Sequence, residues 1–188
     1  MATPLEQFFL RYASLSDEAL AAVTSKFKRR LVKKNGYVLK PGNVCDNLVF
    51  VSSGCLRMYD CQNDVEVSVW FSFANSSAME IYSFISGKPS GYFIQAIEDT
   101  EILLMPKKEL DNLYKAFPSM QEVMRRFLED VVINLIERFT ALQKDSAERR
   151  YLDLLAKPAY MQTIPQKYLA SFIGVTPSSL SRIRRKVK

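Results

Sequence analysis

The last 24 residues, PQKYLASFIGVTPSSLSRIRRKVK, carry the side chains with the clearest chemical potential. Ala170 is small enough for two helices to approach closely, and Gly174, four positions later, permits a left-handed turn. Thr176 can cap a second helix that has Pro177 in its first turn. This spacing predicts a helix-turn-helix whose second helix presents serine and arginine side chains to the solvent.

Such a helix suits the major groove of duplex DNA, where side chains reach base edges and cations bind phosphates. A guanidinium group can bind O6 and N7 of guanine together, which makes Arg182 the best candidate for a base contact. The predicted base contacts are Pro177, Ser178 and Arg182, and the predicted phosphate contacts are Gln166, Lys167, Thr176, Ser181 and Arg185. Arg184, Lys186 and Lys188 would add attraction that does not depend on sequence. A helical hairpin with no DNA role is the alternative.

The charge distribution favours the same segment. Residues 146–188 hold nine basic and two acidic side chains, a net charge of +7, whereas residues 1–145 have a net charge of −1. A basic module attached to a neutral domain is typical of nucleic-acid binding. The alternative is a basic tail that is merely solvated.

The residue types argue against an enzyme. The sequence contains no histidine, which excludes Ser-His-Asp and Cys-His nucleophilic sites, HExxH zinc sites and histidine-ligated haem. Cys45, Cys55 and Cys61 form no CxxC pair, and an iron-sulfur cluster takes about four thiolates. We therefore expect reduced thiols, no catalytic residue, no metal and no cofactor. An enzyme on a cupin-like barrel would have only carboxylates and thiols as ligands.

The elements that must position the basic segment change character along the chain. Helices are predicted over residues 4–12 and 16–30. From Leu31 to about Pro106, short apolar alternations separated by NG, PGN, SSG and QND predict an antiparallel sheet in a barrel or sandwich. A helix returns over Lys107–Ala116, and a further short one is expected over Arg149–Ala156.

A long helix is predicted from Pro118 to Asp145. Its apolar residues recur at steps of three and four between Met120 and Leu142, in a stripe too broad for one face. A helix that packs on its own sheet and on a second copy of itself needs such a surface. A helix buried inside a monomer is the alternative.

Neither a membrane span nor a secretory signal is expected. No uncharged apolar run reaches the length of a spanning helix, and the N-terminal segment MATPLEQFFLRYASL lacks a basic start followed by an apolar core. We therefore expect a cytoplasmic protein.

A β-rich domain, a long helix and a terminal helix-turn-helix, in this order, resemble the Crp/Fnr family of bacterial transcription regulators over nearly the whole chain. KKNGYVLKPGNVCDNLVFVSSGCLRMY looks like the opening strands of that family, EVSVWFSF like the strand before its ligand loop, and LASFIGVTPSSLSRIRRK like its recognition module. The resemblance implies an α+β fold: a cyclic-nucleotide-binding-like jelly-roll sensor domain (1–117), a long dimerisation helix (118–145) and a C-terminal, winged helix-turn-helix domain (146–188). Any wing would have to lie within Pro158–Thr163.

The same resemblance implies a homodimer on a two-fold operator, with double-stranded DNA and RNA polymerase as candidate partners. It places an effector pocket at Glu80, Ser90, Gly91 and Tyr92, although a filled core without ligand is the alternative. Cyclic-nucleotide binders carry a Gly-Glu-Leu run and a later Arg-Ser or Arg-Thr pair. Here Met79 replaces the glycine, and Ser90 with Gly91 replaces the arginine pair, which predicts an effector other than cyclic AMP. Lys88 is only a point charge and is no equivalent of a bidentate arginine.

A different class of function also fits the residues. The chain could be a small-molecule-binding or protein-interaction module whose basic helical tail docks on an acidic partner protein. Retention on DNA that depends on salt would separate the two classes.

Overall fold

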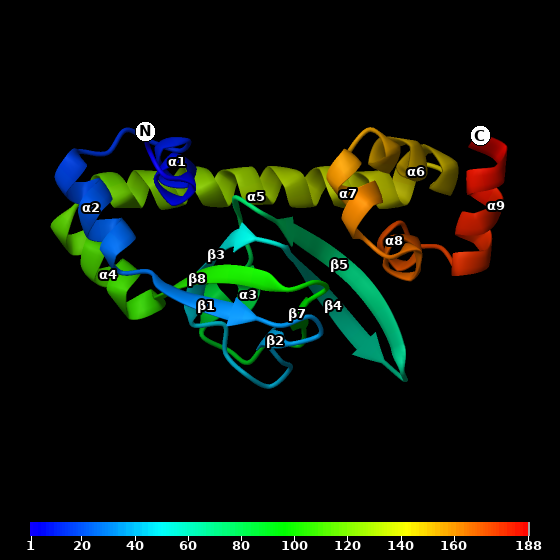
Figure 1. The fold of residues 1–188 in the computed structure, drawn as a ribbon, viewed down its shortest axis with the longest axis horizontal. Helices are drawn as coiled ribbons and strands as arrows, with labels where there is room; N and C mark the ends of the chain where they lie inside the picture. Colours follow the sequence, from blue (N-terminus) through cyan, green and yellow to red (C-terminus); the bar gives the residue numbers. More distant parts are fainter. Residues whose placement is uncertain (188) are drawn as a thin grey trace. The chain divides into compact units, whose positions relative to one another are not determined.

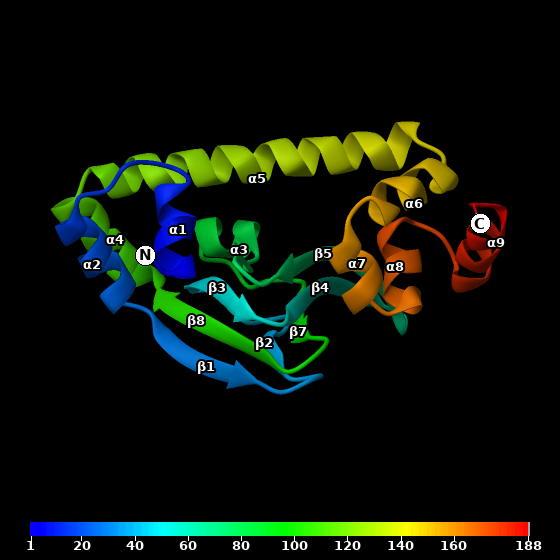
Figure 2. The same cartoon turned by 45° about the horizontal axis from the view of Figure 1, so that its top comes forward.

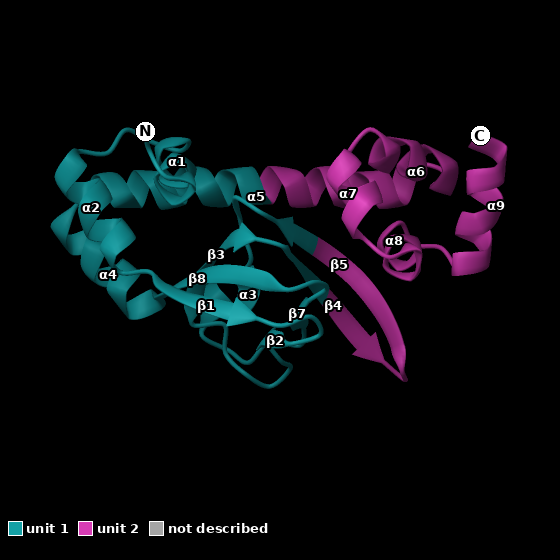
Figure 3. Cartoon of the chain, in the orientation of Figure 1, with its two compact units in different colours: residues 1–58, 71–131 teal, residues 59–70, 132–188 magenta. Residues whose placement is uncertain are grey.

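The computed structural model describes residues 1–187, which form two compact units (Figures 1 and 3). The first unit comprises residues 1–58 and 71–131, and the second comprises residues 59–70 and those from Val132 onward. Three elements contribute to both units: β4 (Cys55–Gln62), β5 (Val65–Phe73) and α5 (Ser119–Lys144). The regions 1–117, 118–145 and 146–188 are a division by function and stay a prediction.

Two short helices open the chain, α1 (Pro4–Leu10) and α2 (Asp17–Ser25). Thr3 and Glu6 form a capping box at the start of α1, and the Ser16 hydroxyl caps α2. The prediction that the second helix reaches residue 30 is wrong. Residues Lys28–Val32 instead form strand β1, because they pair antiparallel with the last strand of the sheet.

The β-rich segment forms two sheets of four strands each, with strand orders β1-β8-β3-β6 and β2-β7-β4-β5. The strand pairs β1·β8, β2·β7, β3·β6 and β3·β8 are antiparallel. This arrangement confirms the predicted jelly-roll. The remaining strands are β2 (Tyr37–Leu39), β3 (Asn47–Ser53), β6 (Ser76–Ser77), β7 (Phe93–Ala96) and β8 (Thr100–Pro106).

The core of the first unit lies where α1, β3 and the first half of α5 meet (Figure 2). The Phe8 ring contacts Phe50 and Phe127 edge to face, with centroid distances of 5.6 and 5.7 Å. Tyr12 also packs on Phe127 and donates a hydrogen bond to Asp130 over 3.4 Å. These contacts bury the amino-terminal half of the long helix against its own domain, as the broad apolar stripe predicts.

The helices after the sheet follow the predicted order. They are α4 (Lys107–Ala116), α5, α6 (Ala147–Leu155), α7 (Pro158–Thr163), α8 (Gln166–Phe172) and α9 (Pro177–Val187); α3 (Ile81–Ser86) lies within the β-rich segment. The prediction of a wing within Pro158–Thr163 is wrong. This segment is helical, with Pro158 in the first turn, and no strand follows Pro106 within residues 1–187. None of the helices in this part of the chain is long and apolar enough to cross a membrane.

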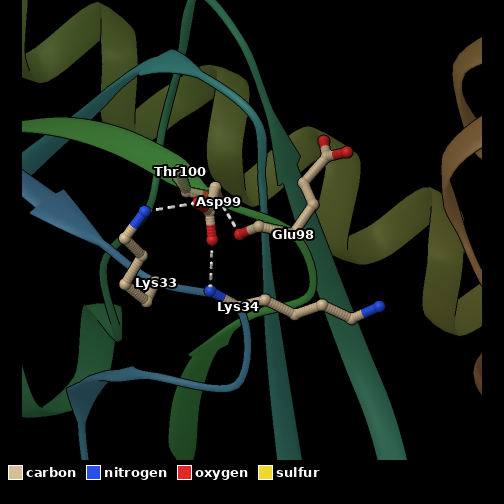
Figure 4. A network of polar contacts seen from close by, with 5 residues as sticks. All are labelled: Lys33, Lys34, Glu98, Asp99 and Thr100. Carbon is tan, nitrogen blue, oxygen red and sulfur yellow. Dashed lines mark hydrogen bonds and ion pairs between the residues drawn. The ribbon is translucent and has the colours of Figure 1, made fainter.

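The turns at one end of the jelly-roll are joined by polar contacts (Figure 4). Asp99 accepts hydrogen bonds from the Lys33 ammonium group over 2.7 Å and from the Lys34 amide over 2.9 Å. The Thr100 hydroxyl donates to the Glu98 carbonyl over 2.9 Å. Gly54 lies against this turn with φ of +85°, and a Cβ atom there would be 2.6 Å from the Thr100 hydroxyl oxygen. Only glycine fits this close approach.

Replacing Gly54 therefore tests the packing of these turns. We expect Gly54→Ala to lower the free energy of unfolding by about 2 to 4 kcal/mol, from a strained φ and a backbone clash. The matched control is Gly42→Ala, which has the same φ of +85° and nothing within 4 Å of a new Cβ, so only the backbone penalty of about 1 to 2 kcal/mol applies. Urea denaturation followed by circular dichroism measures both. Equal losses would contradict the close approach.

Candidate nucleic-acid interface

Helices α8 and α9 and the turn between them form the predicted helix-turn-helix. Ala170 is fully buried, and Leu169 and Leu180 are buried beside it. Gly174 has φ of +73°, in the left-handed region that favours glycine. The small residue and the glycine therefore have the roles that their spacing predicts.

The outer face of α9 is exposed to solvent. All five predicted contact residues on α9 are exposed, namely Pro177, Ser178, Ser181, Arg182 and Arg185. The Arg182 guanidinium donates a hydrogen bond of 3.2 Å to the Ser179 hydroxyl, which restrains the arginine along the helix. The inner face is apolar, with Leu180 buried and Ile183 half-buried. An exposed basic face on an anchored helix can enter a groove of DNA without unfolding any of the module.

Thr176 caps α9, as the sequence predicts. Its hydroxyl accepts a hydrogen bond of 3.2 Å from the Ser179 amide and also contacts the Ser178 hydroxyl over 3.0 Å. The hydroxyl predicted to contact phosphate is therefore already used within the turn. Gln166 and Lys167 are exposed in the first turn of α8 and are open to a phosphate. Lys188 lies outside the described residues.

Two arginines that the sequence analysis did not assign to the site also contact α8. Arg138 on α5 donates to the Phe172 carbonyl over 2.9 Å, and its guanidinium lies 3.5 Å from the centroid of the Phe172 ring. Arg150 on α6 donates to the Ile173 carbonyl over 2.9 Å. Burial lowers the pKa of Arg138 to about 10; the nearby charge of Arg150 adds to this, and Tyr160 opposes it. No sequence signal distinguished Arg138 from Arg125 and Arg126, the other arginines of the long helix.

The hairpin of β4 and β5 supplies a further contact to α8. Ser68 on β5 is almost fully buried, and its hydroxyl lies 2.8 Å from the Ser171 hydroxyl on α8. The Ser68 amide donates to the same Ser171 oxygen over 3.2 Å. Residues 59–70 thus belong to the same compact unit as the helix-turn-helix (Figure 3).

The predicted effector residues lie around α3 and differ in burial. Glu80 is 5% exposed and Ser90 is 3% exposed, whereas Gly91 is exposed and Tyr92 is half-buried. Both Glu80 carboxylate oxygens cap α3, accepting hydrogen bonds from the Tyr82 amide over 2.8 Å and the Ser83 amide over 2.9 Å. The Glu80 side chain is therefore committed to its own helix.

Ser90 is joined to the loop that precedes β3. Its amide donates to the Asn43 carbonyl and its carbonyl accepts from the Gly42 amide, each over 2.8 Å. The Ser90 hydroxyl accepts from the Tyr92 amide over 3.0 Å. The stretch where a cyclic-nucleotide binder holds a phosphate is thus hydrogen-bonded to its own chain.

Buried ionisable groups also occur within the jelly-roll. Arg57 on β4 is a fully buried cation that the sequence analysis did not identify. The cysteines are free thiols, as expected. Burial raises the pKa of Cys45 to about 11 and that of Cys55 to about 12, so neither is a thiolate near neutral pH.

A jelly-roll, a long helix and a helix-turn-helix, in this order along one chain, are the architecture that the sequence analysis expects of a transcription regulator. Residues 29–117 match the family model of the cyclic nucleotide-binding domain. The chain is 20% identical over 170 residues to the fumarate and nitrate reduction regulatory protein of Vibrio cholerae, which covers 83% of this chain and 67% of the relative. It is 19% identical, with the same coverage, to electron transport regulator A of Shewanella oneidensis.

Solved structures show the same fold. A mutant of CooA from Carboxydothermus hydrogenoformans superposes with a TM-score of 0.70 at 22% identity, over 92% of this chain and 85% of CooA. A transcriptional regulator of the Crp/Fnr family from Eubacterium rectale gives a TM-score of 0.71 at 16% identity, over 92% and 83% of the two chains. Together these matches support the resemblance to the Crp/Fnr family of transcription regulators. Its relatives are regulators and not enzymes, in agreement with the sequence analysis.

Proposed function

We propose that this chain is a bacterial DNA-binding transcription regulator that binds a two-fold operator as a homodimer and acts in the cytoplasm. The observation that carries the proposal is the exposed basic face of α9, where Ser178 and Arg182 point away from a buried Leu180. Arg182 is the proposed base contact, with Pro177 and Ser178 beside it. The proposed phosphate contacts are Gln166, Lys167, Ser181 and Arg185. Thr176 is also a proposed phosphate contact, in addition to capping α9. RNA polymerase stays a predicted partner.

The dimer is proposed from the carboxyl-terminal half of α5. Unlike the buried first half, this segment exposes a row of apolar side chains, each of which has another of the row three or four positions away along the helix. Their exposed fractions lie between 40% and 61%, and they are Val132, Ile133, Leu135, Ile136, Phe139 and Leu142. An exposed apolar stripe with coiled-coil spacing is stable in water when a second copy covers it.

The proposed effector is a small molecule other than cyclic AMP. The stretch around α3 offers no arginine for a cyclic phosphate, and the backbone amides at the start of α3 already bind Glu80. A missing guanidinium removes a charge-assisted bond of about 1.5 to 3 kcal/mol. The proposed lining of the effector pocket is unchanged from the sequence analysis and consists of Glu80, Ser90, Gly91 and Tyr92.

The first test concerns Arg182. Duplex DNA is selected from a random pool with the wild-type chain, and binding is measured by fluorescence anisotropy across a salt series. Arg182→Ala should weaken binding to the selected duplex about tenfold or more and reduce its preference over random DNA. Lys186→Ala should weaken binding to both duplexes alike and lower the salt slope by about one. If both variants behave alike, Arg182 is no base contact; if the wild type shows no salt-dependent DNA binding, a partner protein is the better proposal.

The second test concerns the dimer. Phe139→Glu places a charge in the apolar stripe, and we expect a monomer in sedimentation-velocity experiments together with loss of binding to the two-fold duplex. Glu137→Lys, at an exposed position outside the stripe, is the control and should leave the dimer intact. A wild-type chain that sediments as a monomer at micromolar concentration would rule out this interface.

The third test concerns the effector. Titration calorimetry with cyclic AMP should give a Kd at least about tenfold weaker than micromolar, since the charge-assisted bond to the phosphate is missing. The melting temperature should not rise when the nucleotide is added. Micromolar binding of cyclic AMP would show that the missing arginine does not decide specificity.

A further inference from the structure

The carboxyl end of α8 leaves four carbonyl groups without a partner inside the helix, as every α-helix does. These belong to Ala170, Ser171, Phe172 and Ile173. The Val175 amide donates to Ala170 over 3.0 Å, and the Gly174 amide donates to Ser171 over 3.2 Å. This pair of bonds around a left-handed glycine is a Schellman motif. It accounts for two of the four carbonyl groups.

Guanidinium groups satisfy the other two. Arg138 donates to the Phe172 carbonyl and Arg150 to the Ile173 carbonyl, each over 2.9 Å. The Arg138 guanidinium also lies over the Phe172 ring, 3.5 Å from its centroid. A planar fork that both stacks and donates is specific to arginine, because a lysine ammonium group can do only one of these at a time. All four carbonyl groups at the end of α8 therefore have donors.

The same arginines are joined to the end of α5. Arg138 is a residue of α5, and Arg150 donates to the carbonyl groups of Asp145 over 2.5 Å and Leu142 over 3.4 Å. Arg150 therefore bridges the end of α5 and the end of α8. These bonds tie the helix that carries the exposed apolar stripe to the turn from which α9 departs.

We propose that Arg138 and Arg150 are positioning residues that fix the direction of α9 relative to the carboxyl-terminal half of α5, and thereby the half-site spacing that the dimer accepts. This inference rests on the proposed function. Both side chains are half-buried and directed at backbone carbonyl groups. Their guanidinium groups therefore stabilise the end of α8, whereas those of Arg182 and Arg185 are exposed and available to a ligand.

The test uses the full-length chain and the duplex selected with the wild type, together with duplexes whose half-sites are moved apart or together by one base pair. Arg138→Met should bind the selected duplex about tenfold more weakly, because a charge-assisted bond is lost, while the salt slope stays unchanged. It should also discriminate less between the three spacings than the wild type does. Arg138→Lys should behave like Arg138→Met, since the charge alone does not restore the stack.

The matched control is Arg149→Met, which removes a cation from the neighbouring position on α6. The Arg149 side chain is 67% exposed and pairs with Asp153, not with α8. We expect this variant to keep the spacing preference of the wild type. If Arg138→Met lowers the salt slope by about one and keeps the spacing preference, Arg138 is a phosphate contact and the inference is wrong. An Arg138→Met variant with wild-type affinity and spacing preference would also overturn it.

A second readout is independent of DNA. Hydrogen exchange measured by mass spectrometry should show faster exchange in the peptide spanning residues 170–176 for Arg138→Met, and an unchanged rate for Arg149→Met. If the wild type binds no DNA, the proposed function fails, yet this measurement still tests whether Arg138 and Arg150 hold the end of α8 in place. If Arg138→Met does not fold, Arg150→Lys takes its place in the exchange experiment and should show the same faster exchange in this peptide. Unchanged exchange in the folded variants would show that Arg138 and Arg150 are not positioning residues.

Discussion

A helix that ends inside a folded module must find donors for its last carbonyl groups, and α8 finds them in its own turn and in side chains of α5 and α6. Two donors come from the turn itself, which works only because Gly174 adopts a positive φ. The other two come from Arg138 and Arg150. Because unsatisfied buried carbonyl groups cost free energy, the turn has one well-defined geometry. The proposed positioning role of Arg138 and Arg150 rests on that geometry.

Four arginines of the second unit therefore fall into two groups by burial. Arg182 and Arg185 are exposed on α9, whereas Arg138 and Arg150 donate to backbone carbonyl groups. A count of charges along the sequence cannot separate these groups. The net charge of +7 over residues 146–188 includes Arg150, whose guanidinium donates hydrogen bonds to carbonyl groups at the ends of α5 and α8. The exposed cationic surface is thus smaller than the charge count, and much of it lies on α9 and the start of α8.

Much of the architecture could be predicted, because periodicity and turn residues report on local structure. The helix-turn-helix followed from the spacing of Ala170 and Gly174, and the jelly-roll followed from short apolar alternations. Strand β1 was missed because its sequence, KRRLV, is mostly charged and exposed, as edge strands often are. Its partner, β8, lies some 70 residues away in the sequence, and local patterns contain no information on such pairing. The helix at Pro158–Thr163 was missed because the family resemblance favoured a wing there.

The residues of the candidate site were predictable only in part, for the same physical reason. Exposure on α9 follows from helical spacing, and the four side chains expected on its outer face are exposed, namely Ser178, Ser181, Arg182 and Arg185. Arg138 and Arg150 act through carbonyl groups of a helix that is distant in the sequence, and only the folded chain brings them together. The commitment of Glu80 to the start of α3 was likewise invisible, because a glutamate before a short helix serves equally as a cap or as a ligand.

The account depends most directly on α9 lying in a groove of duplex DNA. A photoactivatable benzophenone side chain introduced at Ser178 measures this, with the same group at exposed Gln143 on α5 as the reference. Irradiation with the selected duplex should yield a covalent adduct to bases from position 178 and little adduct from position 143. Adducts from position 143 alone, or none from position 178 on bound DNA, would contradict the account.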